Sequence, residues 1–145
     1  MDDLKLVARL GGQLVALPAA AIESVVELDQ ITPAPLASRH VAGLAPLRSR
    51  VLTVIDSYVA IGEAPADAEG ARQAVVVTID GHSYGLLVDE VEDVVALDCE
   101  IMPLPAGLGR GWAAAAIGLI ELDGQGALLV DPARLVGGGT ALEAA

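Results

Sequence analysis

Residues 6–17, LVARLGGQLVAL, decide the fold, because the related stretch VVVTIDGHSYGL occupies residues 75–86, 69 positions later. Each copy consists of an apolar run, a two-residue turn that contains glycine, and a second apolar run. This order is typical of a β-hairpin, since glycine reaches the positive φ that a tight turn needs. The sequence therefore contains two related hairpins.

The likeness between the two copies extends beyond the hairpins. A Pro-x-Pro segment follows in each copy, at residues 33–35 and 103–105, and after it the offset becomes 75. Val54-Ile55-Asp56 then matches Leu129-Val130-Asp131. We interpret this ordered match as an internal duplication.

The duplication defines the expected domain organisation, in which residues 1–145 form one domain and each half forms one β-barrel. The boundaries of the halves are 4–62 and 74–137, joined by 63–73, a segment rich in Ala, Pro, Gly and charge. Short strands with glycine turns favour small barrels, because closure hides the strand edges.

Local patterns place the elements in each half. Strands are expected at 4–10, 13–17, 25–28 and 51–55, and again at 74–79, 84–88, 94–97, 116–122 and 127–130. Short helical turns are expected at 18–24, 56–61 and 132–136, and an acidic connection at 89–93. The chain is thus mainly β.

Composition and charge exclude several classes of protein. Apolar residues make up 54% of the chain, which excludes disorder, and the net charge of −12 opposes nucleic acid as the main partner. The longest apolar runs span nine residues, 14–22 and 112–120, whereas a membrane-spanning helix needs about 20. We therefore expect no membrane insertion, and the Met-Asp-Asp start gives no sign of a secretion signal.

Catalytic and metal-binding patterns are missing from the sequence. His40, His82 and Cys99 are not at metal-ligand spacing, so neither a metal nor a cofactor is expected. Residues 107–111, GLGRG, lack the Lys-Ser/Thr of a phosphate loop and are expected to be a loop before a strand. We predict no catalytic residue and no enzyme activity.

A small β enzyme of the aspartic-protease type remains as a remote alternative, because an aspartate follows an apolar strand in each half. Such sites need Asp-Ser/Thr-Gly, however, and the sequence has Asp56-Ser57-Tyr58 and Asp131-Pro132-Ala133. We expect Asp56 and Asp131 to cap the short helices that follow them.

A doubly basic segment, GLAPLRSRVL at residues 43–52, interrupts this acidic chain, and here the sequence resembles the CheW family of bacterial chemotaxis coupling proteins. The family pattern G-v-x-N-L-R-G-x-v-l-P-v-i-D-L is matched at Gly43, Leu47, Arg48, Val51, Leu52, Val54, Ile55 and Asp56. The pattern V-x-E-v/i is matched at Val25, Glu27 and Leu28, and G-l-l-V-D-x-V-x-x-V at Gly85, Leu86, Leu87, Val88, Asp89, Val91 and Val94. The resemblance covers residues 4–137.

The resemblance implies a fold, a function and partners. The fold would be two five-stranded, SH3-like β-barrels flanking a shared apolar core with short helices. The protein would be a non-catalytic cytoplasmic adaptor that links the CheW-like regulatory domain of the histidine kinase CheA to the cytoplasmic tips of methyl-accepting chemotaxis receptors. It would be recruited to membrane-associated receptor arrays. The partner-binding residues would be Val25, Glu27, Gly43, Leu47, Arg48, Arg50, Val88 and Val91.

The resemblance also implies a specific ion pair and a specific groove. Glu27 and Arg48 would face each other and hold the 46–50 turn against the 25–28 strand. Val25, Val88 and Val91 would line a receptor-binding groove between the two barrels, although each is also compatible with a place in the core.

The sequence departs from the family pattern at the basic turn, where N-L-R-G reads Pro46-Leu47-Arg48-Ser49. Loss of the glycine would stiffen or reshape the turn. This departure keeps open a second pathway, in which a CheW-like scaffold serves a different kinase in pilus motility or development.

Overall fold

The computed structural model describes residues 4–34, 37–63, 72–96 and 100–137, which form ten strands and four short helical segments. The strands are β1 (Leu4–Leu10), β2 (Gln13–Pro18), β3 (Ile22–Leu28), β4 (Val41–Leu47), β5 (Arg50–Ile55), β6 (Arg72–Ile79), β7 (His82–Val88), β8 (Glu90–Ala96), β9 (Ala116–Leu122) and β10 (Gln125–Val130). The helical segments are η1 (Ala19–Ala21), α1 (Ser57–Ala60), α2 (Arg110–Ala115) and α3 (Pro132–Val136). Most of the expected joint, residues 64–71, lies outside the described residues, as does Cys99.

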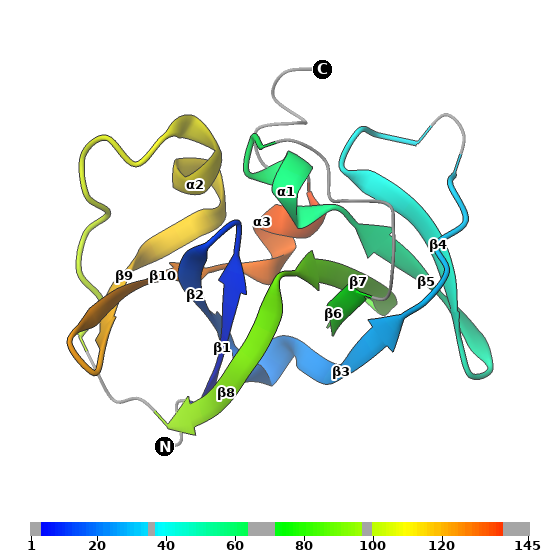
Figure 1. Cartoon of the computed structure of the whole chain (residues 1–145), viewed down its shortest axis with the longest axis horizontal. Helices are drawn as coiled ribbons and strands as arrows, with labels where there is room; N and C mark the ends of the chain where they lie inside the picture. Colours follow the sequence, from blue (N-terminus) through cyan, green and yellow to red (C-terminus); the bar gives the residue numbers. More distant parts are fainter. Residues whose placement is uncertain (1–3, 35–36, 64–71, 97–99, 138–145) are drawn as a thin grey trace.

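The strands of the described residues form two five-stranded sheets, with α1 and α3 between them (Figure 1). Sheet A has the order β8-β1-β2-β10-β9, and sheet B has the order β3-β6-β7-β5-β4. The expectation of a mainly β protein with two five-stranded units is confirmed, while the SH3-like form of each unit stays a prediction.

The expectation that each half forms its own barrel is wrong, because each sheet takes strands from both halves. Sheet A combines β1 and β2 with β8, β9 and β10, and sheet B combines β3, β4 and β5 with β6 and β7. The chain crosses to the other sheet after the β1–β2 hairpin and again after the β6–β7 hairpin. The two halves therefore exchange strands, and neither sheet is complete without both.

The strand orders themselves support the duplication. Replacing β3, β6, β7, β5 and β4 by their sequence equivalents turns the order of sheet B into β8-β1-β2-β10-β9, the order of sheet A. The offset of 75 carries the limits of β4 and β5 onto those of β9 and β10. The bridge Thr32–Leu44 likewise has its counterpart in Met102–Leu119.

The apolar core lies in three layers because the strands are buried on both faces. In β2, Val15 and Leu17 enter a central core that both sheets share, whereas Leu14 and Ala16 enter a core enclosed by sheet A. In β7, Leu86 enters the central core on the same principle. Successive side chains point to opposite faces of a strand, so a continuous apolar run marks a strand covered on both sides.

Three local predictions are corrected by the structure. Strand β4 was not expected, because glycine and proline interrupt its apolar pattern. The acidic residues 90–93 belong to β8 rather than to a connection, so Asp89 alone separates β7 from β8. The loop at residues 107–109 leads into helix α2 and not directly into a strand.

The expected helix caps are confirmed. The Asp56 carboxylate accepts hydrogen bonds from the backbone N–H groups of Tyr58 at 3.1 Å and Val59 at 3.4 Å. The Asp131 carboxylate accepts one from Ala133 at 3.0 Å. These bonds satisfy donors that the first helical turn leaves free. They account for both aspartates as structural groups and leave the protease alternative without support.

Gly43, a candidate partner-binding residue, has a structural role in β4. It is buried, and a Cβ atom built on it would lie 2.1 Å from the backbone oxygen of Thr32. Thr32 and Leu44 exchange backbone hydrogen bonds of 2.8 Å at this place. Only glycine therefore lets the 32–34 segment approach β4.

We predict that Gly43→Ala lowers the free energy of unfolding by about 2 kcal/mol or more, because two backbones must separate. Urea denaturation measures this. Gly126→Ala in β10 is the control, since its Cβ would make only an ordinary contact at 3.5 Å to Leu119, and it should change stability by less than about 0.5 kcal/mol. A stable Gly43→Ala variant with reduced partner binding would contradict the structural role.

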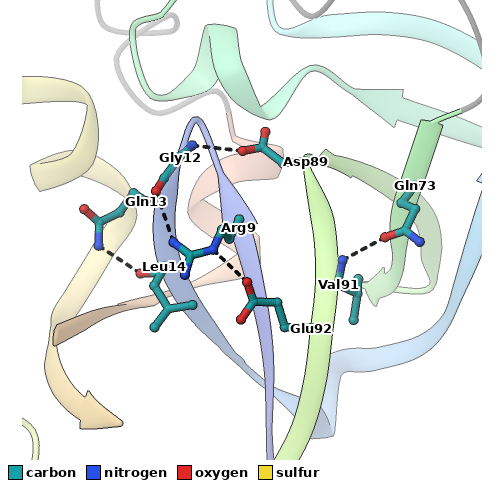
Figure 2. A network of polar contacts seen from close by, with 8 residues as sticks. All are labelled: Arg9, Gly12, Gln13, Leu14, Gln73, Asp89, Val91 and Glu92. Atoms are coloured by element: carbon teal, nitrogen blue, oxygen red, sulfur yellow. Dashed lines mark hydrogen bonds and ion pairs between the residues drawn. The ribbon is translucent and has the colours of Figure 1, made fainter. Parts of the chain in front are cut away.

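Asp89 stabilises the place where the chain crosses from sheet B to sheet A. Its carboxylate accepts hydrogen bonds from the backbone N–H groups of Gly11 at 3.1 Å and Gly12 at 2.9 Å, and from the Tyr58 hydroxyl. Its own N–H donates to the Arg9 carbonyl oxygen at 2.8 Å. Figure 2 shows the carboxylate facing the β1–β2 turn. Burial, and then the bond to Asp89, raises the pKa of Tyr58 above its usual value, so the hydroxyl remains a donor.

We predict that Asp89→Ala lowers the free energy of unfolding by about 1–3 kcal/mol, because three donors lose a charged acceptor. Urea denaturation gives the stability, and amide hydrogen exchange at Gly11 and Gly12 locates the loss. Glu90→Ala removes the neighbouring carboxylate, which makes no hydrogen bond or ion pair among the described residues, and should be neutral. Equal losses in the two variants would disprove the role of Asp89.

Candidate functional site

A groove of about 630 Å³ lies between the two edges of sheet B, and we call it the β3 groove. Strand β3 supplies one wall and the turn that joins β4 to β5 supplies the other. Its lining residues are Glu23, Ser24, Val25, Val26, Leu47, Arg48, Ser49 and Arg50. Because β3 and β4 stand at opposite ends of the strand order, the sheet must curl to bring them to one groove.

A second hollow, of about 340 Å³, continues along the same two strands. It is lined by Glu27, Leu28, Asp29, Gln30 and Pro46. Together the two hollows follow β3 over most of its length.

Strand β3 presents its polar and apolar groups to the groove by simple alternation. Glu23, Val25 and Glu27 are exposed, and the residues between them are partly buried. Val25 is 40% exposed, which is high for a valine in a sheet and fits a residue that lines a groove. Val25 and Glu27 were predicted as partner-binding residues and Glu23 was not, although the same period of two places all three on one face.

The ion pair across the groove differs from the one expected. Among the described residues, Glu27 and Arg48 form no ion pair, and the turn is instead held to β3 by a pair between Arg50 and Glu23. The turn lies opposite residues 23–26, whereas Glu27 lies opposite Pro46. Glu23 and Glu27 lie about 13 Å apart along the strand, and the turn pairs with the nearer of the two, Glu23.

Arg50 is the better-connected of the two groove arginines. Its guanidinium contacts the Glu23 carboxylate and also donates to the Ser83 hydroxyl of β7 at 3.0 Å. Arg48 is exposed and makes no hydrogen bond or ion pair with any described residue. Two of the chain's eight basic residues therefore meet in one groove of an acidic protein.

The β4–β5 turn differs from the other three hairpin turns of the described residues. In those turns both central residues have positive φ, as at Asp80 and Gly81, but here only Arg48 does, with φ of 55°. Serine at position 49 does not favour positive φ as glycine does. The turn thus has a different backbone form from the other three, while its difference from the family turn stays a prediction.

The remaining candidate residues are buried or partly buried. Val88 is 7% exposed and lies in the central core, and Val91 is half-buried against the same core. The Val91 N–H donates to Gln73 Oε1 at 2.7 Å (Figure 2). Leu47 packs partly on the sheet B core, and Gly43 is buried. Val88 is therefore not a groove residue, because its side chain lies in the core, and the groove that Val25 lines lies within sheet B rather than between the two five-stranded units.

The duplication repeats the β3 groove in sheet A with different chemistry. A hollow of about 200 Å³ lies between β8 and the β9–β10 turn, lined by Val7, Leu14, Glu92, Asp93, Val95, Leu122, Asp123 and Gln125. Arg48 and Arg50 correspond to Asp123 and Gln125, so this hollow has an acidic rim. Glu92 pairs with Arg9 on the adjacent strand at 2.7 Å (Figure 2).

The described residues contain neither a membrane-spanning helix nor a cluster of metal ligands. None of their helices has the length and apolar character needed to cross a membrane. In the same part of the chain, no three His, Cys, Asp or Glu side chains gather where they could hold a metal ion.

Comparison of the sequence with known proteins identifies several relatives that share one description. The relatives include the chemotaxis protein CheW of Rhizobium meliloti (strain 1021), 27% identical over 85% of this chain and 80% of that protein, and the chemotaxis protein CheW of Thermotoga maritima, 25% identical over 86% and 81%. A probable chemotaxis protein CheW of Rhizobium etli is 30% identical over 71% of this chain and 68% of that protein.

A solved structure and a family model agree with these relatives. The crystal structure of the scaffolding protein TtCheW from Thermoanaerobacter tengcongensis superposes with a TM-score of 0.76 at 24% identity, over 90% of this chain and 89% of that one, which shows the shared fold. The model of the CheW-like domain matches residues 5–138. The chain therefore belongs to the CheW-like domain family.

Proposed function

We propose that this protein is a non-catalytic cytoplasmic adaptor that couples chemoreceptors to a histidine kinase in bacterial chemotaxis. The observation that carries the proposal is the β3 groove, which is lined by the exposed Val25 and by Arg48 and Arg50. The chain that bears this groove belongs to the CheW-like domain family. Family membership and the names of the relatives support chemotaxis.

The groove suits one partner, the cytoplasmic tip of a methyl-accepting receptor. Such a tip is a helical hairpin, and an apolar stripe on it would pack against Val25 in the helix-in-groove mode. Arg48 and Arg50 would set its orientation through charge, which contributes more to specificity than to affinity. Modest affinity is sufficient in a receptor array, because multivalent contacts strengthen weak ones.

The second partner is the CheW-like regulatory domain of the kinase CheA. Glu27 and Arg48, which line the two hollows along β3, are the residues proposed for its binding. A titration of this chain with the regulatory domain of the kinase encoded in the same genome tests the coupling. Binding only to a kinase of another pathway would favour a role in pilus motility or development.

We predict that Val25→Glu weakens binding to a soluble receptor cytoplasmic fragment at least tenfold, about 1.4 kcal/mol, because a carboxylate replaces the apolar contact. Val25 is already 40% exposed, so circular dichroism and thermal melting should stay close to those of the wild type. Isothermal titration calorimetry measures the affinity.

The matched control for this variant is Val94→Glu. Val94 is exposed and occupies the position in β8 that Val25 occupies in β3. It should leave receptor binding unchanged. Intact folding with undiminished binding of the Val25 variant would remove the groove from the receptor site.

We predict that Arg48→Glu weakens binding of both partners while the free energy of unfolding changes by less than about 0.5 kcal/mol, because this exposed side chain has no partner among the described residues. Surface plasmon resonance at low and moderate salt measures the loss, which should shrink as salt screens the charge. Arg110→Glu on α2 makes the same change of charge away from the groove. A matching loss with Arg110→Glu would assign the effect to net charge alone.

A further inference from the structure

The ion pair between Glu23 and Arg50 spans the β3 groove from one wall to the other. Glu23 lies on β3, and Arg50 opens β5 directly after the basic turn. Arg50 is also held by Ser83 on β7 at 3.0 Å. One nitrogen of the guanidinium is thus held by Ser83 and another by the Glu23 carboxylate.

The fold does not require this pair. In sheet A the equivalents of Glu23 and Arg50 are Glu92 and Gln125, and Glu92 pairs along the sheet with Arg9 instead. Gln125 makes no side-chain hydrogen bond with any described residue. The equivalent hollow forms without an ion pair across it. The pair in sheet B is therefore an addition to the shared scaffold.

The pair is weak enough to be replaced. The side chains of Glu23 and Arg50 are 38% and 45% exposed. Exposed ion pairs shift an equilibrium by no more than about fivefold, because water competes for both charges. A carboxylate brought by a partner would meet Arg50 already oriented by Ser83, with the unpaired Arg48 beside it.

The charge of the groove indicates the chemistry of its occupant. The walls offer an apolar contact at Val25 and two cations at Arg48 and Arg50, within a chain whose net charge is −12. Charge complementarity selects an apolar segment that bears a carboxylate. A basic segment would leave Arg48 and Arg50 facing like charge.

We propose that Glu23 competes with the partner for Arg50. Glu23 holds the Arg50 guanidinium in the free protein, and an acidic side chain of the docked segment takes the place of Glu23 when the partner binds. This inference rests on the proposed function, since the segment belongs to the receptor tip bound in the β3 groove. Glu23 therefore reduces affinity and favours partners that carry a carboxylate at the matching position.

The test is Glu23→Gln, which keeps the shape of the side chain and removes its charge. Its affinity for a soluble receptor cytoplasmic fragment, measured by isothermal titration calorimetry, should rise about two- to fivefold. Glu92→Gln, the equivalent change in sheet A, should leave affinity unchanged even though it too breaks an ion pair. The gain should disappear in 1 M salt, where charges are screened.

A double-mutant cycle assigns the gain to Arg50. Arg50→Gln should weaken binding, and adding Glu23→Gln to it should give no further change, because no guanidinium remains to release. Unchanged or weaker binding of Glu23→Gln, or a gain that persists without Arg50, overturns the inference while leaving the adaptor function intact. Self-association of Glu23→Gln in sedimentation equilibrium would also overturn it, by showing a second copy in the groove. If neither wild type nor variant binds receptor or kinase, the proposed function fails and the inference fails with it.

Discussion

The central core, to which both sheets contribute, is the constraint on which the rest of the structure depends. A strand such as β2 has no polar face to turn toward water, because Val15 and Leu17 enter the central core while Leu14 and Ala16 enter the sheet A core. Such a strand is stable only when both of its sides are covered. Each half supplies five strands but divides them between the two sheets, and the exchange of β1 and β2 against β6 and β7 places strands of both halves around the central core. Folding of either sheet therefore requires the whole chain.

Because the halves exchange strands, the chain must cross between the sheets twice, and the arrangement of the sheets depends on these two crossings. One crossing uses η1, whereas the other is the single residue Asp89. A crossing this short leaves little freedom in the chain path, and the Asp89 carboxylate anchors it to the β1–β2 turn and to Tyr58. The position of one sheet relative to the other is thus fixed, and so is the position of the β3 groove relative to the equivalent hollow in sheet A. That rigidity suits a docking protein, because a preorganised surface loses less entropy on binding.

Local chemistry made the strands, hairpin turns and helix caps predictable from the sequence. Asp80-Gly81 and Asp123-Gly124 predict their turns, and Asp56 and Asp131 predict their caps, because each effect acts over a few residues. The composition of each sheet was not predictable in this way, since a repeat reveals two similar units and not which copy of a strand pairs with which. The β4 strand was missed because Gly43 and Pro46 are poor strand formers whose places are secured by tertiary contacts.

The site was harder to predict than the fold for a related reason. An apolar residue in a short strand has the same appearance in the sequence whether it faces a groove, as Val25 does, or the core, as Val88 does. The partner of Arg50 depends on how far sheet B curls, which no local pattern records, and so Glu23 was overlooked. The duplication makes the difference visible once the structure is known: two hollows of common origin keep the same walls, while their exposed charges have diverged. In a duplicated scaffold the core residues preserve the shape and the exposed residues are free to change, so recognition is expected to reside in the few side chains by which the two copies differ.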